Sequence, residues 1–232
     1  MKPLENCKLY TFVDTAYLNG RAPETIAQQL CDGGSDLIQL RAKRSSPDEI
    51  CRMAEAIVPI TKRAGVRLVV NDYPDIACEV GAEFCHLGQE DFFDAGHKHV
   101  RELKITSETP SASTLQPFNA STPFLQIGLS SHAPEQAQRA IEAGADYIAV
   151  GPVYATGTKP GRKPVTLEYV RWAAQNVKAP WFAIGGINLE NLDDVLAAGA
   201  GGICVVSAIL NALDVAGACR KFREKLESVA SG

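Results

Sequence analysis

The sequence has few of the features that mark membrane, secreted or nucleic-acid-binding proteins. Its 232 residues contain no apolar run of about 18 residues, and the first residues lack the apolar segment and cleavage site of a signal peptide. We therefore expect a cytoplasmic protein with no membrane partner. The net charge is −4, and Lys and Arg cluster nowhere along the chain, which argues against a nucleic-acid partner.

Cysteine pairs and histidine clusters are also missing. The 7 cysteines are scattered, odd in number and include no C-x-x-C pair, so we expect reduced thiols, most of them small core residues. His97 and His99 have no nearby cysteine and no carboxylate at ligand spacing, so we expect no zinc site there.

A short phrase is repeated four times along the chain. It consists of a helix end, a glycine, a small residue and a buried strand, and reads GSDLIQLR from Gly34, GAEFCHLG from Gly81, GADYIAVG from Gly144 and GAGGICVV from Gly199. The phrases begin 47, 63 and 55 residues apart, and each interval has room for two strand–helix units. We interpret the phrases as the even-numbered strands of a parallel sheet.

Odd-numbered strands and helices are expected between these phrases. The apolar strand candidates are YTFV (10–13), RLVV (67–70), LQIGL (125–129) and WFAI (181–184). Helical spacing of apolar residues predicts helices at Pro23–Cys31, Pro47–Ala64, Pro134–Ala143, Leu167–Asn176, Leu189–Ala198 and Leu213–Val229. Ser46 and Pro47 suit the N-cap and the first position of the second of these helices.

Eight alternating units in 232 residues predict a single-domain α/β protein, a (β/α)8 TIM barrel over residues 1–232, since such barrels typically have about 250 residues. The alternative is an open doubly wound sheet, but no G-x-G-x-x-G follows the first strand. The longest interval contains residues 104–124, of which eleven of 21 are Ser, Thr or Pro. We interpret this segment as a mobile loop insertion without assigned chemistry, with an active-site lid as the alternative.

The sixth strand runs into a loop suited to holding a phosphate. Gly151 and Gly157 allow close approach of backbone N–H groups, Thr156 and Thr158 offer donors, and Lys159 adds a point charge. An ordinary surface loop shares this composition, so the other strand ends must be compared with it. In a parallel barrel the functional groups lie at the C-terminal ends of the strands.

The second and third strands also end in polar residues. Gln39, Arg41 and Lys43 alternate, so their side chains are expected on one side, where Arg41 and Lys43 could bind a diphosphate. The alternative is a solvated strand end with salt bridges. Asn71 and Asp72 end the third strand.

A second carboxylate follows the fourth strand at Asp91. Two carboxylates beside a diphosphate suggest Mg²⁺, although helix N-capping would also explain Asp72 and Asp91. Ser130 at the end of the fifth strand is a candidate donor. Free N–H groups after the seventh and eighth strands, at Gly186 and at Val206–Ser207, would form a second phosphate site.

Seven motifs at these strand ends resemble the thiamine-phosphate synthase family: QLRAK, ND, HLGQED, GLSSH, GPVYATGTKPG, AIGGIN and VVSAIL. The resemblance covers nearly all of the chain outside the insertion. It implies a transferase of thiamine biosynthesis that joins hydroxymethylpyrimidine diphosphate to a thiazole phosphate, releases pyrophosphate and uses one Mg²⁺ per subunit. The route it implies is ionisation of the pyrimidine diphosphate followed by attack of the thiazole nitrogen.

The resemblance also implies roles for individual residues. It assigns the pyrimidine diphosphate to Gln39, Leu40, Arg41, Ala42, Lys43, Asn71, Ser130 and Lys159, and the thiazole phosphate to Thr156, Gly157, Thr158, Gly186, Val206 and Ser207. It assigns Mg²⁺ to Asp72 and Asp91, and catalysis to Arg41, Lys43, Ser130 and Lys159.

Two other functions compete with the synthase. The related thiazole tautomerase shares the barrel and implicates a histidine that matches His132, and a non-catalytic barrel could hold a phosphorylated ligand without turnover. The complete QLRAK, ND and QED set favours the synthase, because neither rival needs a diphosphate and a metal. The sequence leaves open whether the chain forms a homo-oligomer.

Overall fold

The computed structural model is a closed barrel of eight parallel strands, and it describes residues 2–103, 125–157 and 163–228. The strands are β1 Leu9–Asp14, β2 Leu37–Arg41, β3 Arg67–Asn71, β4 Phe84–Leu87, β5 Gln126–Ser131, β6 Tyr147–Val150, β7 Trp181–Ile184 and β8 Ile203–Cys204. Each pairs with its sequence neighbours, and β1 pairs with β8. The predicted (β/α)8 barrel is confirmed, and the open doubly wound sheet is excluded.

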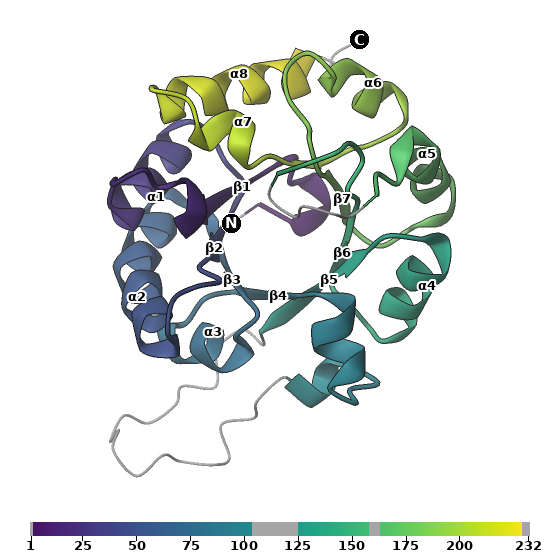
Figure 1. Cartoon of the computed structure of the whole chain (residues 1–232), viewed down its shortest axis with the longest axis horizontal. Coiled ribbons are helices and arrows are strands. Elements are labelled where there is room, and N and C mark those ends of the chain that lie inside the picture. Colours follow the sequence, from purple (N-terminus) through teal and green to yellow (C-terminus); the bar gives the residue numbers. More distant parts are fainter. Residues whose placement is uncertain (1, 104–124, 158–162, 229–232) are drawn as a thin grey trace.

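Helices surround the strands as a ring (Figure 1). They are α1 Pro23–Asp32, α2 Pro47–Ala64, α3 Pro74–Val80, α4 Pro134–Glu142, α5 Thr166–Asn176, α6 Leu192–Ala197, α7 Ser207–Leu210 and α8 Val215–Ser228. Short turns of 3-10 helix occupy Leu4–Asn6, Thr15–Tyr17 and Val100–Leu103, and a π-helical turn occupies Glu90–Asp94. The unit after β4 thus carries a π turn and a 3-10 turn among its described residues.

All six predicted helices are present, with differences at their ends. The sequence places the start of α6 at Leu189, but Asn188 Oδ1 accepts the N–H groups of Glu190 and Asn191, and this turn delays the helix to Leu192. The start of α2 is confirmed: Ser46 and Glu49 form a reciprocal capping box, with Pro47 in the first turn. Sequence reasoning missed α3, which has only 7 residues.

The repeated phrase has a structural reason at the N-terminal end of the barrel. In three of its four copies the residue before the strand is acidic, and its carboxylate accepts backbone N–H groups of the preceding odd-numbered strand. Asp36 accepts from Lys8 and Leu9, Glu83 from Leu68, and Asp146 from Ile127. These carboxylates satisfy donors at strand starts that would otherwise need solvent.

Aromatic rings fill the barrel interior. Phe182 packs edge to face against Tyr10 and Tyr147, at centroid distances of 5.4 and 5.7 Å, and Phe84 meets Tyr147 at 5.9 Å. All four side chains are fully buried. Burying one such ring contributes about 2–3 kcal/mol to folding.

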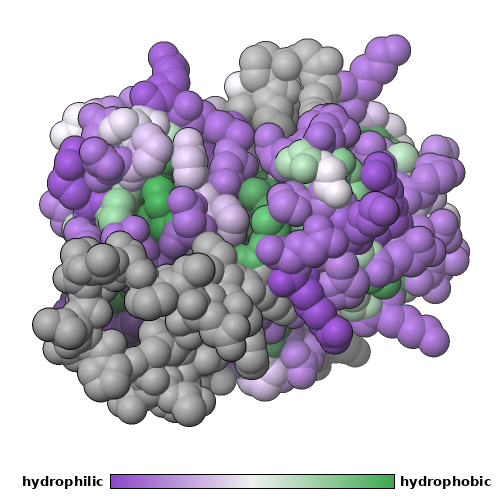
Figure 2. Space-filling view, turned by 90° about the horizontal axis from the view of Figure 1, so that it is seen from below, coloured by the Kyte–Doolittle hydropathy of each residue, from purple (hydrophilic) through white to green (hydrophobic). Residues whose placement is uncertain are grey.

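The exterior is predominantly hydrophilic on the face shown in Figure 2. Among the described residues, the large hydrophobic side chains that are exposed are Ile141 and Leu213. No helix of residues 2–103, 125–157 and 163–228 has the length and apolarity needed to cross a membrane. The predicted insertion at 104–124 lies outside the described residues, as do Thr158 and Lys159.

Candidate functional site

A cavity lies at the C-terminal mouth of the barrel. Eight residues predicted from the sequence line it: Gln39, Arg41, Asn71, Ser130, Thr156, Gly186, Val206 and Ser207. They come from β2, β3 and β5, from the loops after β6 and β7, and from the β8–α7 junction. Segments far apart in the sequence therefore bring hydrogen-bond donors and a cation to one concave site, as expected at this end of a barrel.

Gln39 and Arg41 reach the cavity because residues of a strand alternate between its two sides. The intervening Leu40 and Ala42 are buried, so only their backbone is suited to a ligand contact. Arg41 Nη1 donates to Asp14 Oδ2 at 2.8 Å, and these two residues are paired neighbours of β2 and β1. The predicted strand-end salt bridge therefore exists, but its guanidinium also lines the cavity.

Lys43 lies just beyond β2 and pairs with Asp72, with Nζ 2.5 Å from Oδ2. Asp72 has a left-handed backbone with φ 69°, which is uncommon for a residue with a side chain. Its N–H donates to His86 O at 2.9 Å, an interaction that fixes this turn against β4. Lys43 and Asp72 lie outside the cavity lining, and this pair shows that the Asp72 carboxylate accommodates a cation.

Helix capping explains neither predicted metal ligand. The N-cap of α3 is Tyr73, without a side-chain cap, so Asp72 does not cap it. Asp91 is inside the π turn, whose N-cap is Gln89. The Asp91 carboxylate packs against Gly88, where an added Cβ would lie 2.6 Å from Oδ2. Among the described residues, no group of three or more His, Cys, Asp or Glu is arranged to hold a metal.

The glycines after β6 and β7 permit close backbone packing at the mouth. Gly151 N–H donates to Ser131 O at 3.1 Å. This group is therefore bonded within the barrel, and the prediction that it approaches a ligand was wrong. A Cβ on Gly151 would instead lie 2.0 Å from Ile184 O. Gly186 has φ 67°, and a Cβ there would lie 2.7 Å from both Ala155 O and Tyr154 Cβ. A side chain at either glycine would force the β6 and β7 loops apart.

The β8–α7 junction presents helix-start donors to the same cavity. Val206 precedes α7, and Ser207 is its first residue. Ile209 N–H donates to Val206 O at 3.1 Å, and the N–H groups of Ser207 and Ala208 have no acceptor within the helix. A Cβ on Gly157 would meet no atom of the described residues within 4 Å.

His132 also lines the cavity. Its Nδ1 contacts Gly151 O, and its backbone N–H donates to Gln136 Oε1 at 2.8 Å. Neither Ser131 nor His132 caps α4, whose N-cap is Ala133. Ser131 Oγ instead donates to Ala149 O at 3.0 Å.

Sequence reasoning missed three polar side chains that connect the predicted residues Gln39 and Ser130, namely Tyr10, Tyr147 and His86. Gln39 Nε2 donates to Tyr10 Oη at 2.6 Å, and Tyr10 Oη lies 3.0 Å from Tyr147 Oη. His86 Nδ1 lies 3.0 Å from Tyr147 Oη, and His86 Nε2 lies 3.0 Å from Ser130 Oγ. The sequence signal for them was a polar residue within an apolar strand. That signal does not identify the hydrogen-bond partners, because they lie on other strands.

Comparison with known proteins gives a consistent family. The family model described as "Thiamine monophosphate synthase" matches residues 9–105 and 114–209. The chain is 45% identical over 200 residues to "Thiamine-phosphate synthase" of Thermus thermophilus, covering 85% of this chain and 86% of that protein. It is 34% identical over 231 residues to "Thiamine-phosphate synthase" of Halalkalibacterium halodurans, covering 99% of this chain and 100% of the relative.

A solved structure agrees. "Thiamine phosphate pyrophosphorylase" from Pyrococcus furiosus superposes with a TM-score of 0.79 at 30% identity, covering 98% of this chain and 99% of that one. Tryptophan synthase of Mycobacterium tuberculosis superposes with a TM-score of 0.65 at 15% identity, which shows a shared fold alone. The sequence matches, the solved relative and the barrel itself agree, and the chain belongs to the thiamine monophosphate synthase family.

Proposed function

We propose that the chain couples 4-amino-2-methyl-5-hydroxymethylpyrimidine diphosphate to a thiazole phosphate to form thiamine phosphate and pyrophosphate, and that a carboxylated thiazole phosphate would also release CO2. The observation that carries the proposal is the cavity shared by Arg41, Asn71 and Ser130 on one part of its wall and by Thr156, Gly186 and Ser207 on another. One concave site thus offers two sets of groups suited to anions, as a reaction between two phosphorylated substrates requires.

The pyrimidine diphosphate would be held by the β2, β3 and β5 residues. Gln39, Arg41, Asn71 and Ser130 line the cavity and supply a cation and neutral donors. Lys43 lies at the end of β2, and its ammonium would move from Asp72 to a phosphate oxygen when the diphosphate binds. Leu40 and Ala42 would contribute backbone groups, and Lys159 a further cation.

The thiazole phosphate would be held by the opposite loops. Thr156, Gly186, Val206 and Ser207 line the cavity there. Backbone donors at the start of α7 suit a phosphate, because first-turn N–H groups point out of the helix. Gly157 and Thr158 would extend this site.

Asp72 and Asp91 would hold Mg²⁺. This hard cation commonly uses one or two protein carboxylates and completes its coordination with water and substrate phosphates. The pairing of Asp72 with Lys43 supports the fit, because it places a carboxylate where a cation is accommodated beside the end of β2. When bound, Mg²⁺ would neutralise charge on the diphosphate leaving group.

The chain's own residues would act through charge and position. The C–O bond between the exocyclic methylene and the diphosphate breaks, and pyrophosphate leaves with the electron pair while Arg41, Lys43 and Lys159 neutralise it. Ser130 would orient the departing group. The nitrogen of the positioned thiazole then donates its lone pair to the pyrimidine methylene cation and forms the C–N bond.

No protein nucleophile is needed for this route. Cys85 is fully buried, and burial raises the pKa of its thiol well above the usual range. A thiol of this kind packs in the core and does not attack a substrate. The tautomerase hypothesis, based on His132, is not favoured, because the relatives named above are synthases.

The test is to mix the protein with both substrates and Mg²⁺ and to measure thiamine phosphate and pyrophosphate together, with and without EDTA. We expect equal amounts of both products and their loss with the chelator. Folded protein that forms no thiamine phosphate would refute the proposal. Thiamine phosphate formation that persists in EDTA would refute the Mg²⁺ assignment while leaving the coupling reaction intact.

A further inference from the structure

A network of buried hydrogen bonds crosses the barrel, and four of its five members line the cavity. It runs from Gln39 on β2 to Tyr10 on β1, Tyr147 on β6, His86 on β4 and Ser130 on β5. Its donor–acceptor distances are 2.6, 3.0, 3.0 and 3.0 Å, and each member is at most 7% exposed. Five strands therefore contribute to one network that ends at a residue of the proposed diphosphate site.

One direction of donation is consistent along the network, and it starts at the Gln39 end. The amide nitrogen of Gln39 can only donate, so Tyr10 Oη accepts from it. The Tyr10 hydrogen is then available for Tyr147 Oη, and the Tyr147 hydrogen for His86 Nδ1. An imidazole that accepts at Nδ1 carries its proton on Nε2, from which it donates to Ser130 Oγ.

We propose that His86, Tyr147 and Tyr10 are positioning residues that make Ser130 a hydrogen-bond donor to the pyrimidine diphosphate. With its oxygen occupied as acceptor by His86, Ser130 turns its own hydrogen toward the cavity that it lines. The position then favours an acceptor on the substrate, such as a phosphate oxygen, and disfavours a donor. This inference rests on the proposed function of the cavity.

The environment of the phenols supports this arrangement. Burial raises the pKa values of Tyr10 and Tyr147 well above the usual range, so both hydroxyls keep the hydrogens that they donate. The rings of His86 and Tyr147 are stacked at a centroid distance of 5.6 Å, which limits their rotation. The geometry of this hydrogen-bonded network, called the relay from here on, is therefore held by packing as well as by hydrogen bonds.

Gly128 on β5 makes room for the central member. A Cβ at this position would lie 2.0 Å from Tyr147 Cζ and 2.5 Å from its hydroxyl oxygen. Since Gly128 is two residues before Ser130, the same strand supplies both the space for the Tyr147 ring and the hydroxyl at the end of the relay. The Tyr147 ring thus explains why the first residue of the GLSSH motif is a glycine.

The first test is the tautomer of His86, measured by ¹⁵N-histidine NMR on the wild-type protein without ligand. The His86 signals are identified from their loss in His86→Gln. We expect the neutral Nε2–H tautomer, with less of it in Tyr147→Phe. A predominant Nδ1–H tautomer in wild type would overturn the proposal, whatever the activity of the protein.

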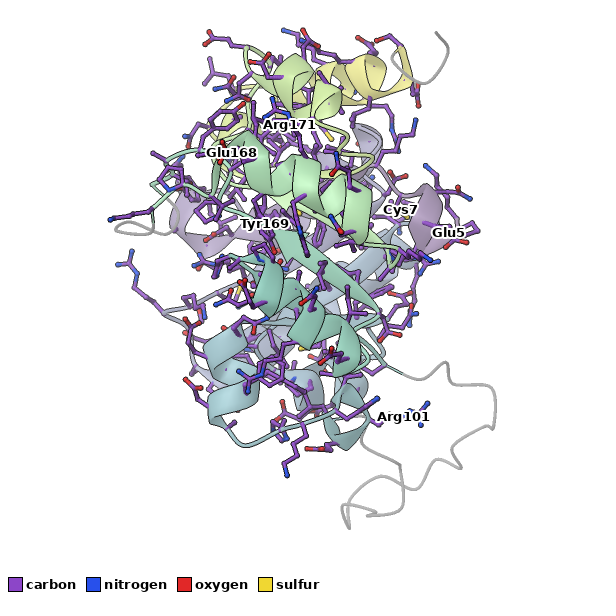
Figure 3. All side chains as sticks on the ribbon, turned by 90° about the vertical axis from the view of Figure 1, so that its right-hand side faces the viewer. Glu5, Cys7, Arg101, Glu168, Tyr169 and Arg171 are labelled. Carbon is purple, nitrogen blue, oxygen red and sulfur yellow. The ribbon has the colours of Figure 1, made fainter. Side chains whose placement is uncertain are left out.

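The second test is kinetic. Tyr147→Phe keeps the ring and removes the hydroxyl, and we expect kcat for thiamine phosphate formation to fall about tenfold, the effect of roughly one hydrogen bond from Ser130 to the substrate. The KM for the thiazole phosphate should stay within about twofold, since the relay ends at the other substrate. The matched control is Tyr169→Phe. Tyr169 is a buried residue of α5 (Figure 3), and its hydroxyl bonds Ser131 Oγ at 2.9 Å and Ala133 O at 2.8 Å, outside the relay.

A double variant separates positioning from a general loss of packing. Because the relay acts through Ser130, adding Tyr147→Phe to Ser130→Ala should lower kcat no further than Ser130→Ala does alone. Independent, multiplying effects would overturn the proposal, and so would a Tyr147→Phe variant with wild-type kcat. Absence of thiamine phosphate formation by wild type would instead refute the proposed function, and the NMR result would still decide the direction of the relay.

Discussion

The two ends of the barrel hold their charged side chains in different ways. At the N-terminal end, marked in Figure 3 by Glu5 and Cys7 before β1, Asp36 accepts hydrogen bonds from Arg223, from Lys2 and from two backbone N–H groups. At the mouth, Arg41 and Lys43 each have one carboxylate partner among the described residues, Asp14 and Asp72. At the N-terminal end, the Asp36 carboxylate accepts four hydrogen bonds. At the mouth, each cation has a single carboxylate partner in the described part of the chain and can also contact a ligand.

This difference separates stability from function. A buried carboxylate with four donors contributes to folding, because removal of one partner leaves a buried group unsatisfied. Lys43 is different, because its pair with Asp72 is partly exposed and its ammonium can exchange the carboxylate for a phosphate at little cost. We therefore expect substitutions at the N-terminal end to change the free energy of unfolding and substitutions at the mouth to change turnover.

The largest effect is expected for Asp72→Ala. Loss of this carboxylate should lower kcat/KM for thiamine phosphate formation about 1,000-fold, equivalent to about 4 kcal/mol, because charge on the departing diphosphate is no longer neutralised. Calorimetric titration with thiazole phosphate should give unchanged binding. The control is Asp75→Ala, which removes an exposed acid of the α3 first turn. An active Asp72→Ala variant would remove Asp72 from the proposed metal site.

Asp36→Asn should lower the free energy of unfolding by about 3 kcal/mol, because Arg223 and Lys2 lose their buried charge partner. Urea denaturation measures this change, and the activity of the folded variant should match wild type. The control is Glu227→Gln, at an exposed partner 3.7 Å from Arg223, which should cost less than about 1 kcal/mol. Equal effects of the two substitutions would contradict the distinction between the two ends.

Lowering the pH should remove the stabilisation that the Asp36 carboxylate provides. Burial alone would raise the Asp36 pKa, but hydrogen bonds from Arg223, from the backbone of Leu9 and Lys8 and from Lys2 lower it below its usual range. Stability from this group is therefore fully present above the unfolded carboxyl pKa of about 3.9 and is lost as pH falls through the folded value. In urea denaturation, the free energy of unfolding of wild type should exceed that of Asp36→Asn by a constant amount from about pH 5 to pH 8. The two values should converge below about pH 4. A difference that grows with acid would contradict this assignment.

Asp14→Ala should lower kcat/KM about tenfold, equivalent to about 1.4 kcal/mol, because Arg41 is no longer oriented toward the cavity. Asp14→Asn keeps an acceptor for the guanidinium and should recover most of the activity. Steady-state kinetics with varied pyrimidine diphosphate measures both. Failure of Asp14→Asn to exceed Asp14→Ala would show that the charge, not the geometry, of Asp14 matters.

The smallest effect is expected for Ser46→Ala, which removes the capping box of α2 at the end of the loop that follows β2. The free energy of unfolding should fall by about 1 kcal/mol, as for other N-caps. Product formation should not change. A loss of activity in this variant would mean that the position of Lys43, in the same loop, depends on the cap of α2.

The sequence predicts the barrel and much of its mouth because both depend on local patterns. Strand and helix periodicity locates the units, and the alternation of Gln39 and Arg41 places both side chains on the cavity. The π turn at Glu90–Asp94 and the short α3 could not be predicted, since neither has a periodic apolar face of sufficient length.

The interior relay was missed for a different reason. Tyr10, His86 and Tyr147 each read as one polar residue in an apolar strand. Their meeting depends on the register of β1, β4 and β6 around the closed barrel. Such contacts join residues as many as 137 positions apart, and no local pattern encodes them.

The most direct measurement is a crystal structure of the protein with thiamine phosphate, pyrophosphate and Mg²⁺. We predict pyrophosphate against Arg41 and Asn71, the ion between pyrophosphate and Asp72, and the phosphate of the product at Gly186 and Ser207. Product bound in the reverse orientation, or outside this cavity, would contradict the account.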